Sequence, residues 1–276
     1  LNTIWLQGKD IAPMRKLAVT APDGRAIDAW LIEPVGRRPG QKVPLILEIH
    51  GGPHTEYGPG FSTDYQLYAA AGYAVLEEVI STARAAGFLV IADVKRGDIG
   101  STAAAYGQAW LAPGSPLEAD AMTAVAYQGL GSLDPVIELA AAHGKGVFVL
   151  TATSNPEGRG LQQSVSGSGR SVAGQLARDV AVRNAGASGW GGLGVVIGAT
   201  EPITASGIDP VLLQHTAVLG PGFGHQGTRL GTLHEVYGVA AASVIPTVTR
   251  SVLSAGPDGL EAALDAHRAE LERASA

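Results

Sequence analysis

Hydrophobic and polar positions follow two repeating patterns from about residue 77 to the end of the chain. Short apolar runs alternate with segments whose apolar residues recur at helical spacing. This alternation is typical of β/α units, which build a parallel sheet or barrel. The predicted strands are Phe88 to Val94, Ala121 to Val125, Val147 to Leu150, Val195 to Ile197, Thr216 to Leu219 and Val244 to Val248.

The intervening helices are marked by one apolar face each. The first predicted helix ends at Gly87, and Asp258 is predicted to cap the last one. His267 falls on the apolar face of that last helix, where we interpret it as a packed or half-exposed residue rather than a ligand. The apolar positions of the two helices are Leu76, Val79, Ile80 and Ala83, then Leu260, Leu264 and Leu271.

Residues 1–76 follow a different pattern. The runs Lys16 to Thr20 and Ala26 to Ile32 flank an Asp-Gly turn, which predicts an antiparallel hairpin. A Pro- and Gly-rich loop comes next, and then a continuous apolar strand, Val43 to Ile49. We therefore predict two parts, residues 1–76 and 77–276.

Composition narrows the function classes. With 276 residues, 46% of them hydrophobic, the chain can bury one large core or two small ones. A net charge of −6 without a basic run argues against nucleic-acid binding. The chain has no cysteine, no apolar stretch of about 18 residues and no signal-peptide pattern. We expect a cytoplasmic protein without a membrane or nucleic-acid partner.

Candidate catalytic residues lie at the end of the first predicted strand of the β/α part and in the loop after it. Asp93 and Lys95 are alternate residues at its end, so they should share a face, and Asp98 follows in the next loop. Active sites of β/α barrels are built at this end of the strands. A lysine between two carboxylates stays protonated and suits the formation and quenching of a carbanion. Taken alone, this spacing favours a different interpretation, a solvated loop with an ion pair.

A phosphate site is predicted near the C-terminus. The turn Pro221 to Gly227 can present backbone N–H groups to an anion, and Arg250 follows the last strand as a charged partner. Barrels often bind phosphate in the loops after their last two strands. The Gly-rich turn alone would be read as a tight loop, and Arg250 changes that reading.

The run Asp93-Val94-Lys95-Arg96-Gly97-Asp98-Ile99-Gly100-Ser101-Thr102 closely resembles the signature of orotidine 5'-phosphate decarboxylases, especially their longer-chain branch. The resemblance covers roughly residues 72–276 in order. It continues through Thr153 to Pro156, Gly198 to Thr200, Pro221 to Gly227 and Thr249 to Ser251.

This resemblance implies a TIM-type barrel, a nucleotide substrate, no metal or organic cofactor, and a homodimer. Lys95 would protonate C6 of the pyrimidine after carbon dioxide leaves, and Asp93 would hold Lys95 and crowd the substrate carboxylate. The remaining implied roles are contact with the partner subunit's site for Asp98, Ile99 and Thr102, with the pyrimidine for Ser154, and with the 5'-phosphate for Gln226 and Arg250.

Two further parts of the family pattern do not occur in this chain: a first-strand aspartate that binds the ribose, and a second-strand lysine. The residues in their place, Pro44 to His54 and Tyr65 to Leu76, resemble prolyl-oligopeptidase-type α/β-hydrolases. The chain contains no Gly-x-Ser-x-Gly elbow, and Gly186 to Gly191 has the wrong spacing, so it is predicted to be a flexible loop. We infer a chimera joined within Ala71 to Leu76.

The resulting prediction is an α/β protein with a TIM-type (β/α)8 barrel, in which a foreign β-rich N-terminal segment replaces the first two β/α units. The predicted activity is decarboxylation of orotidine 5'-phosphate to uridine 5'-phosphate. A catalytically impaired nucleotide-phosphate-binding chimera is the alternative, and a serine hydrolase is a third, disfavoured one.

Overall fold

The computed structural model describes residues 14–20, 26–32 and 74–275. The chain divides into two compact units, Leu1–Gly87 and Phe88–Ala276. The predicted strand Val43 to Ile49, the turn that follows it and the join within Ala71 to Leu76 lie wholly or partly outside the described residues.

The described residues of the first unit form the predicted hairpin strands and a helix. Strand β1 (Met14–Thr20) pairs antiparallel with β2 (Ala26–Ile32), which confirms the antiparallel arrangement. Helix α3 (Ala74–Ala85) ends before Gly87, whose φ of 83° only glycine adopts without strain. The predicted helix and its stop residue are therefore confirmed.

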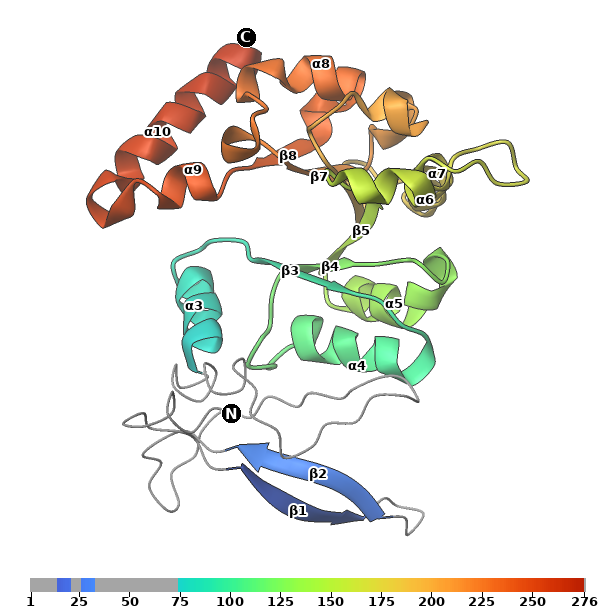
Figure 1. Cartoon of the computed structure of the whole chain (residues 1–276), viewed down its shortest axis with the longest axis vertical. Helices are drawn as coiled ribbons and strands as arrows, with labels where there is room; N and C mark the ends of the chain where they lie inside the picture. The colour runs from blue at the N-terminus through green and yellow to red at the C-terminus, as the bar shows by residue number, and fades with distance from the viewer. Residues whose placement is uncertain (1–13, 21–25, 33–73, 276) are drawn as a thin grey trace, which may run out of the picture. The chain divides into compact units, whose positions relative to one another are not determined.

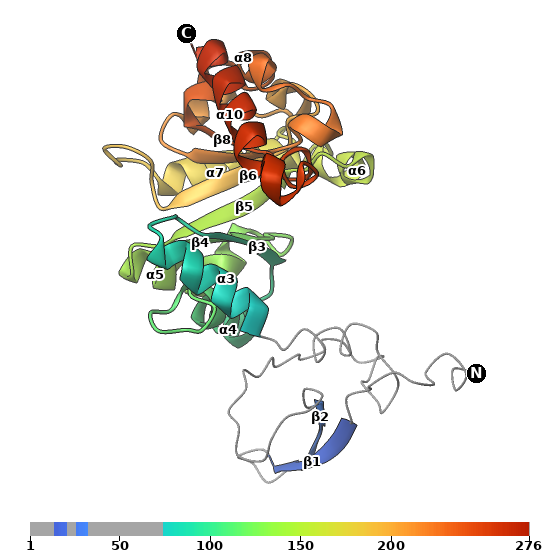
Figure 2. The same ribbon diagram turned by 90° about the vertical axis from the view of Figure 1, so that its left-hand side faces the viewer.

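The second unit is a curled parallel sheet of six strands in the order β3-β4-β5-β6-β7-β8, with helices packed against it (Figures 1 and 2). Within the described residues β3 and β8 are its edges, so the sheet is the TIM-type arrangement without a seventh or eighth strand there. The strands are β3 (Ile91–Arg96), β4 (Ala121–Ala124), β5 (Gly146–Ala152), β6 (Leu193–Ile197), β7 (Ala217–Pro221) and β8 (Val244–Thr247). The helices are α4 (Gly100–Leu111), α5 (Asp134–Ala142), α6 (Arg159–Gln162), α7 (Val172–Arg183), α8 (Leu233–Tyr237), α9 (Arg250–Leu253) and α10 (Gly256–Ser275).

Each face of this sheet carries its own apolar cluster, because successive strand residues point to opposite sides. The larger cluster contains Met122, Val149 and Val195 and packs against helices such as α4, α5 and α7. The smaller one gathers around Phe148 on the other face. Gly194 lies beside that ring, where a Cβ would approach Phe148 Cδ1 to 2.4 Å, so glycine is needed there.

Several element boundaries differ from prediction by one to three residues, and two of them have a clear structural cause. Strand β3 begins at Ile91, because pairing with β4 begins there, and Phe88 and Leu89 are 68% and 85% exposed. Helix α10 begins at Gly256, so Asp258 lies in its first turn instead of capping it. In both places local composition indicated the right element, but tertiary pairing or backbone geometry set its first residue.

Asn184 fastens the end of α7 to the start of β6. Its buried amide donates to the Leu193 carbonyl (2.8 Å) and to Thr216 Oγ1 (3.0 Å), and accepts from Leu193 N–H (3.2 Å). Asn184→Ala should lower the free energy of unfolding by about 2–3 kcal/mol, because it leaves buried backbone groups unpaired. Urea denaturation measures this. Asn155→Ala, at an exposed asparagine, is the control, and equal stability of the two variants would contradict the prediction.

Candidate active site

A bulge in β3 shapes the backbone around the predicted catalytic lysine. Pairing runs from Ala92↔Met122 directly to Arg96↔Ala124, so three residues of β3 face a single residue, Thr123, of β4. Lys95 has a φ of 48°, and it is the one non-glycine residue with positive φ in the part of the chain described. This conformation is unfavourable for a side chain with a Cβ, and bulges of this kind often re-aim residues at active sites.

Hydrogen bonds hold the bulge together. Lys95 Nζ forms an ion pair with Asp93 Oδ2. The Lys95 backbone N–H donates to Thr123 Oγ1 (2.8 Å), and the same hydroxyl donates to Asp93 Oδ1 (2.9 Å). The structure thus brings Asp93 and Lys95 together, as predicted. Thr123 was not predicted, because a threonine within an apolar strand has no distinguishing signal.

Asp98, Ile99 and Thr102 lie beyond the bulge, at the start of α4. Asp98 Oδ1 accepts the Ile99 N–H at 2.8 Å, while Ile99 is 61% exposed and Thr102 is also exposed. Gly97 packs so closely against β4 that a Cβ would come within 2.2 Å of the Val125 carbonyl oxygen. These residues therefore lie just after the Lys95–Asp93 pair in the chain, with Ile99 and Thr102 exposed and Asp98 half-buried.

Ser154 follows β5 at the same, carboxyl end of the sheet. Its backbone lies against Gly198, just after β6, where a Cβ would come within 2.8 Å of the Ser154 nitrogen. Neighbouring Thr153 is fixed by Gln162, which accepts from its N–H (2.9 Å) and donates to its hydroxyl (2.8 Å). Close packing and these bonds determine where the Ser154 segment runs.

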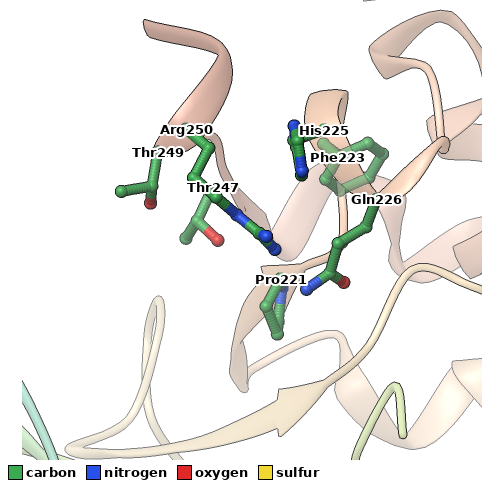
Figure 3. Close-up of a pocket in the computed structure, with 8 residues that line it drawn as sticks. Pro221, Phe223, His225, Gln226, Thr247, Thr249 and Arg250 are labelled. Carbon is green, nitrogen blue, oxygen red and sulfur yellow. The ribbon is translucent and has the colours of Figure 1, made fainter. Parts of the chain in front are cut away.

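A cavity of about 130 Å³ opens at the carboxyl ends of β7 and β8, where the phosphate site was predicted. The side chains of Arg250 and Gln226 point toward one another across it (Figure 3). Its walls are Pro221, Gly222, Phe223, His225, Gln226, Thr247, Thr249 and Arg250. Gln226 and Arg250 were thus predicted from the sequence, whereas His225, which also lines the cavity, was given no role.

The turn that forms this cavity depends on glycines and on contacts behind it. Gly222 and Gly224 have φ values of 122° and 74°. A Cβ at Gly224 would lie 2.6 Å from Ser251 Oγ, and that hydroxyl is hydrogen-bonded to His267 Nε2 at 3.0 Å. His267 is a partly buried helix residue, which confirms the prediction.

Tyr237 packs against the ends of β6 and β7. Its hydroxyl donates to the Ile197 carbonyl at 2.7 Å, and burial raises the pKa of the phenol far above its usual value. It therefore remains neutral and acts as a hydrogen-bond donor. Gly220 leaves space for this hydroxyl, since a Cβ there would approach it to 2.7 Å.

The serine-containing loop Gly186 to Gly191 lies at the opposite end of the sheet, because it precedes β6. It has neither helix nor strand, as predicted. Gly191 packs against Asn184, where a Cβ would approach Oδ1 to 2.1 Å. The glycine spacing that partly matches a hydrolase elbow therefore has a packing explanation here.

Neither a membrane-spanning helix nor a metal-binding cluster occurs among the described residues. None of the described helices combines the length and apolar character needed to cross a membrane. Among these same residues, no three His, Asp or Glu side chains are grouped so that they could hold a metal ion.

Comparison with known proteins identifies the family of this chain. The family model described as Orotidine 5'-phosphate decarboxylase / HUMPS family matches residues 59–266. The chain belongs to this family. An orotidine 5'-phosphate decarboxylase of Salinispora tropica is 47% identical over 197 residues, which cover 71% of this chain and 70% of that protein. One from Corynebacterium glutamicum is 48% identical over 199 residues, covering 70% and 69%.

Solved structures agree with this membership. A Streptomyces avermitilis protein assigned as orotidine 5'-phosphate decarboxylase superposes with a TM-score of 0.71 at 44% identity, covering 77% of this chain and 74% of that one. The Leishmania donovani OMP decarboxylase gives a TM-score of 0.60 at 29% identity, covering 76% and 78%. The six-stranded sheet is thus the decarboxylase-family barrel arrangement over this part of the chain.

Proposed function

We propose that this chain decarboxylates orotidine 5'-phosphate to uridine 5'-phosphate in pyrimidine nucleotide synthesis. The observation that carries the proposal is the Lys95–Asp93 pair on the bulge of β3, in a chain that has a basic cavity after β7 and β8. Membership of the decarboxylase family supports the same reaction.

In the proposed mechanism Asp93 and Lys95 act together. The Asp93 carboxylate lies near the departing carboxylate of the substrate and repels it, which favours loss of carbon dioxide. The electron pair left on C6 is then quenched by a proton from Lys95 Nζ. Their direct ion pair supports this division of roles, because it fixes the ammonium beside the carboxylate.

The proposed substrate grip uses residues from the ends of three strands. Arg250 binds two phosphate oxygens with its guanidinium, and Gln226 donates to a third from the opposite side of the cavity. Ser154, after β5, contacts the pyrimidine. A phosphate held in this way fixes the base relative to Lys95 at low entropic cost.

The proposed assembly is a homodimer in which Asp98 enters the partner's active site, flanked by Ile99 and Thr102. The exposure of Ile99 supports this, because an apolar residue at 61% exposure gains by being covered. Sedimentation of the purified chain tests the dimer. Asp98→Asn should lower turnover, whereas a monomeric enzyme with full activity would contradict the arrangement.

The N-terminal proposals concern residues 1–76. We propose that this segment is hydrolase-like and foreign to the barrel formed by residues 77–276, and that the whole protein is cytoplasmic. The hydrolase-like character of this segment is supported by the likeness of Pro44 to His54 to α/β-hydrolases. The family match itself starts at residue 59, and the division into compact units falls after Gly87.

One alternative function is favoured by a specific observation. A strand-two lysine and a ribose-binding aspartate do not occur in the sequence, so a chain that binds nucleotide phosphate without turnover is the competing function. It shares the phosphate cavity but not the chemistry.

Loss of orotidine 5'-phosphate absorbance on adding purified protein separates the two functions. Turnover is expected, with uridine 5'-phosphate as product. Calorimetric binding of uridine 5'-phosphate by a folded protein without turnover would select the alternative. Labelling by a serine-directed fluorophosphonate probe would instead revive a hydrolase.

A further inference from the structure

The hydroxyl of Thr123 lies where the catalytic segment leaves regular strand geometry. Thr123 faces the bulge of β3 from the neighbouring strand β4, and 0% of its surface is exposed. Thr123 pairs in register with Phe148 of β5, so it lies on the sheet face that carries the smaller apolar cluster. Water is excluded from this position, so the bonds of the hydroxyl are made within the protein.

A threonine hydroxyl has one proton to donate and two lone pairs. Here the Lys95 N–H occupies one lone pair at 2.8 Å, and the proton goes to Asp93 Oδ1 at 2.9 Å. Because the other oxygen of Asp93 meets Lys95 Nζ, the four groups form a closed ring. A single side chain therefore fixes both the backbone of the lysine and the orientation of its carboxylate partner.

The backbone of Lys95 needs such a restraint. A residue with a Cβ pays about 1–2 kcal/mol in the left-handed region, so the φ of 48° persists only if its surroundings enforce it. In a regular ladder, an N–H that faces the neighbouring strand donates to one of its backbone carbonyls. In this bulge the Thr123 hydroxyl replaces that carbonyl.

We propose that Thr123 is a positioning residue that aims the Lys95–Asp93 pair by bonding the Lys95 N–H and the Asp93 carboxylate with one hydroxyl. This inference rests on the proposed decarboxylation for its kinetic consequences. It adds a residue from β4 to the catalytic pair that β3 carries.

Thr123→Val tests the hydroxyl, because valine keeps the shape and removes both hydrogen bonds. We expect kcat to fall on the order of 10-fold with KM within about 2-fold, since a misplacement of about 1 Å can cost up to roughly 100-fold. Thr123→Ser should recover most of the loss. Thr151→Val is the matched control, because Thr151 is also buried, on β5, and its hydroxyl donates to the Val149 carbonyl of its own strand (3.0 Å).

Amide hydrogen exchange at Lys95, measured by NMR, gives a readout that does not need turnover. Exchange should accelerate about 10-fold in Thr123→Val and remain slow in Thr123→Ser and Thr151→Val. A wild-type chain that fails to decarboxylate would remove the proposed function but leave this exchange result to decide on Thr123. Unchanged kcat and unchanged exchange in Thr123→Val would overturn the inference, as would equal losses in the valine and serine variants.

Discussion

Lys95→Ala is expected to abolish almost all turnover of orotidine 5'-phosphate, with kcat reduced by roughly 10²–10⁴-fold. A positioned general acid contributes an effect of this size, and alanine has no proton to give to C6. Lys95→Arg should be nearly as inactive, because a guanidinium keeps the charge but does not release its proton at neutral pH. Initial rates measured by absorbance test both variants.

The fold of these variants needs a separate control. The Lys95 and Asp93 side chains are 52% and 59% exposed, so loss of their ion pair alone should change stability little. Lys95→Gly should be more stable than Lys95→Ala by about 1 kcal/mol, because glycine accepts the φ of 48°. Both should be inactive. An active, folded Lys95→Ala protein would exclude Lys95 as the proton donor.

Arg250→Ala is expected to raise KM for orotidine 5'-phosphate by roughly 10- to 100-fold. Hydrogen bonds to a charged group contribute about 1.5–3 kcal/mol. In the proposed function the guanidinium of Arg250, which lines the cavity after β8, makes such bonds to the phosphate. Arg229→Ala is the matched control, because that arginine is 80% exposed and is not among the residues that line the cavity.

The substrate itself supplies a second control for Arg250. Orotidine lacks the phosphate, so Arg250→Ala should turn it over at the same low rate as the wild-type protein. Inhibition by inorganic phosphate should weaken in Arg250→Ala and remain unchanged in Arg229→Ala. A phosphate effect that survives the loss of Arg250 would move the phosphate site elsewhere.

The sequence predicted the β/α part well because its strands are short apolar runs separated by amphipathic helices. All six predicted strands appear, and the pair Asp93 and Lys95 meets as expected. Strand ends were less predictable. Phe88 and Leu89 continue an apolar run, yet they lie before the first residue that pairs with β4.

The geometry of the site was only partly predictable. Alternation along a regular strand would place Asp93 and Lys95 on one face, whereas they meet through a bulge with a left-handed residue. In that bulge the Lys95 N–H donates to Thr123, 28 residues away along the chain, and no local pattern reports such a pairing. The cavity at the predicted phosphate site was easier to locate, because the glycines of its turn and the arginine that follows are both visible as residue types in the sequence.

The most direct test of the proposed decarboxylation is release of carbon dioxide from carboxyl-labelled orotidine 5'-phosphate by the purified chain. We predict one carbon dioxide for each uridine 5'-phosphate formed, with both products lost in Lys95→Ala. A folded chain that binds uridine 5'-phosphate yet releases no carbon dioxide would contradict it.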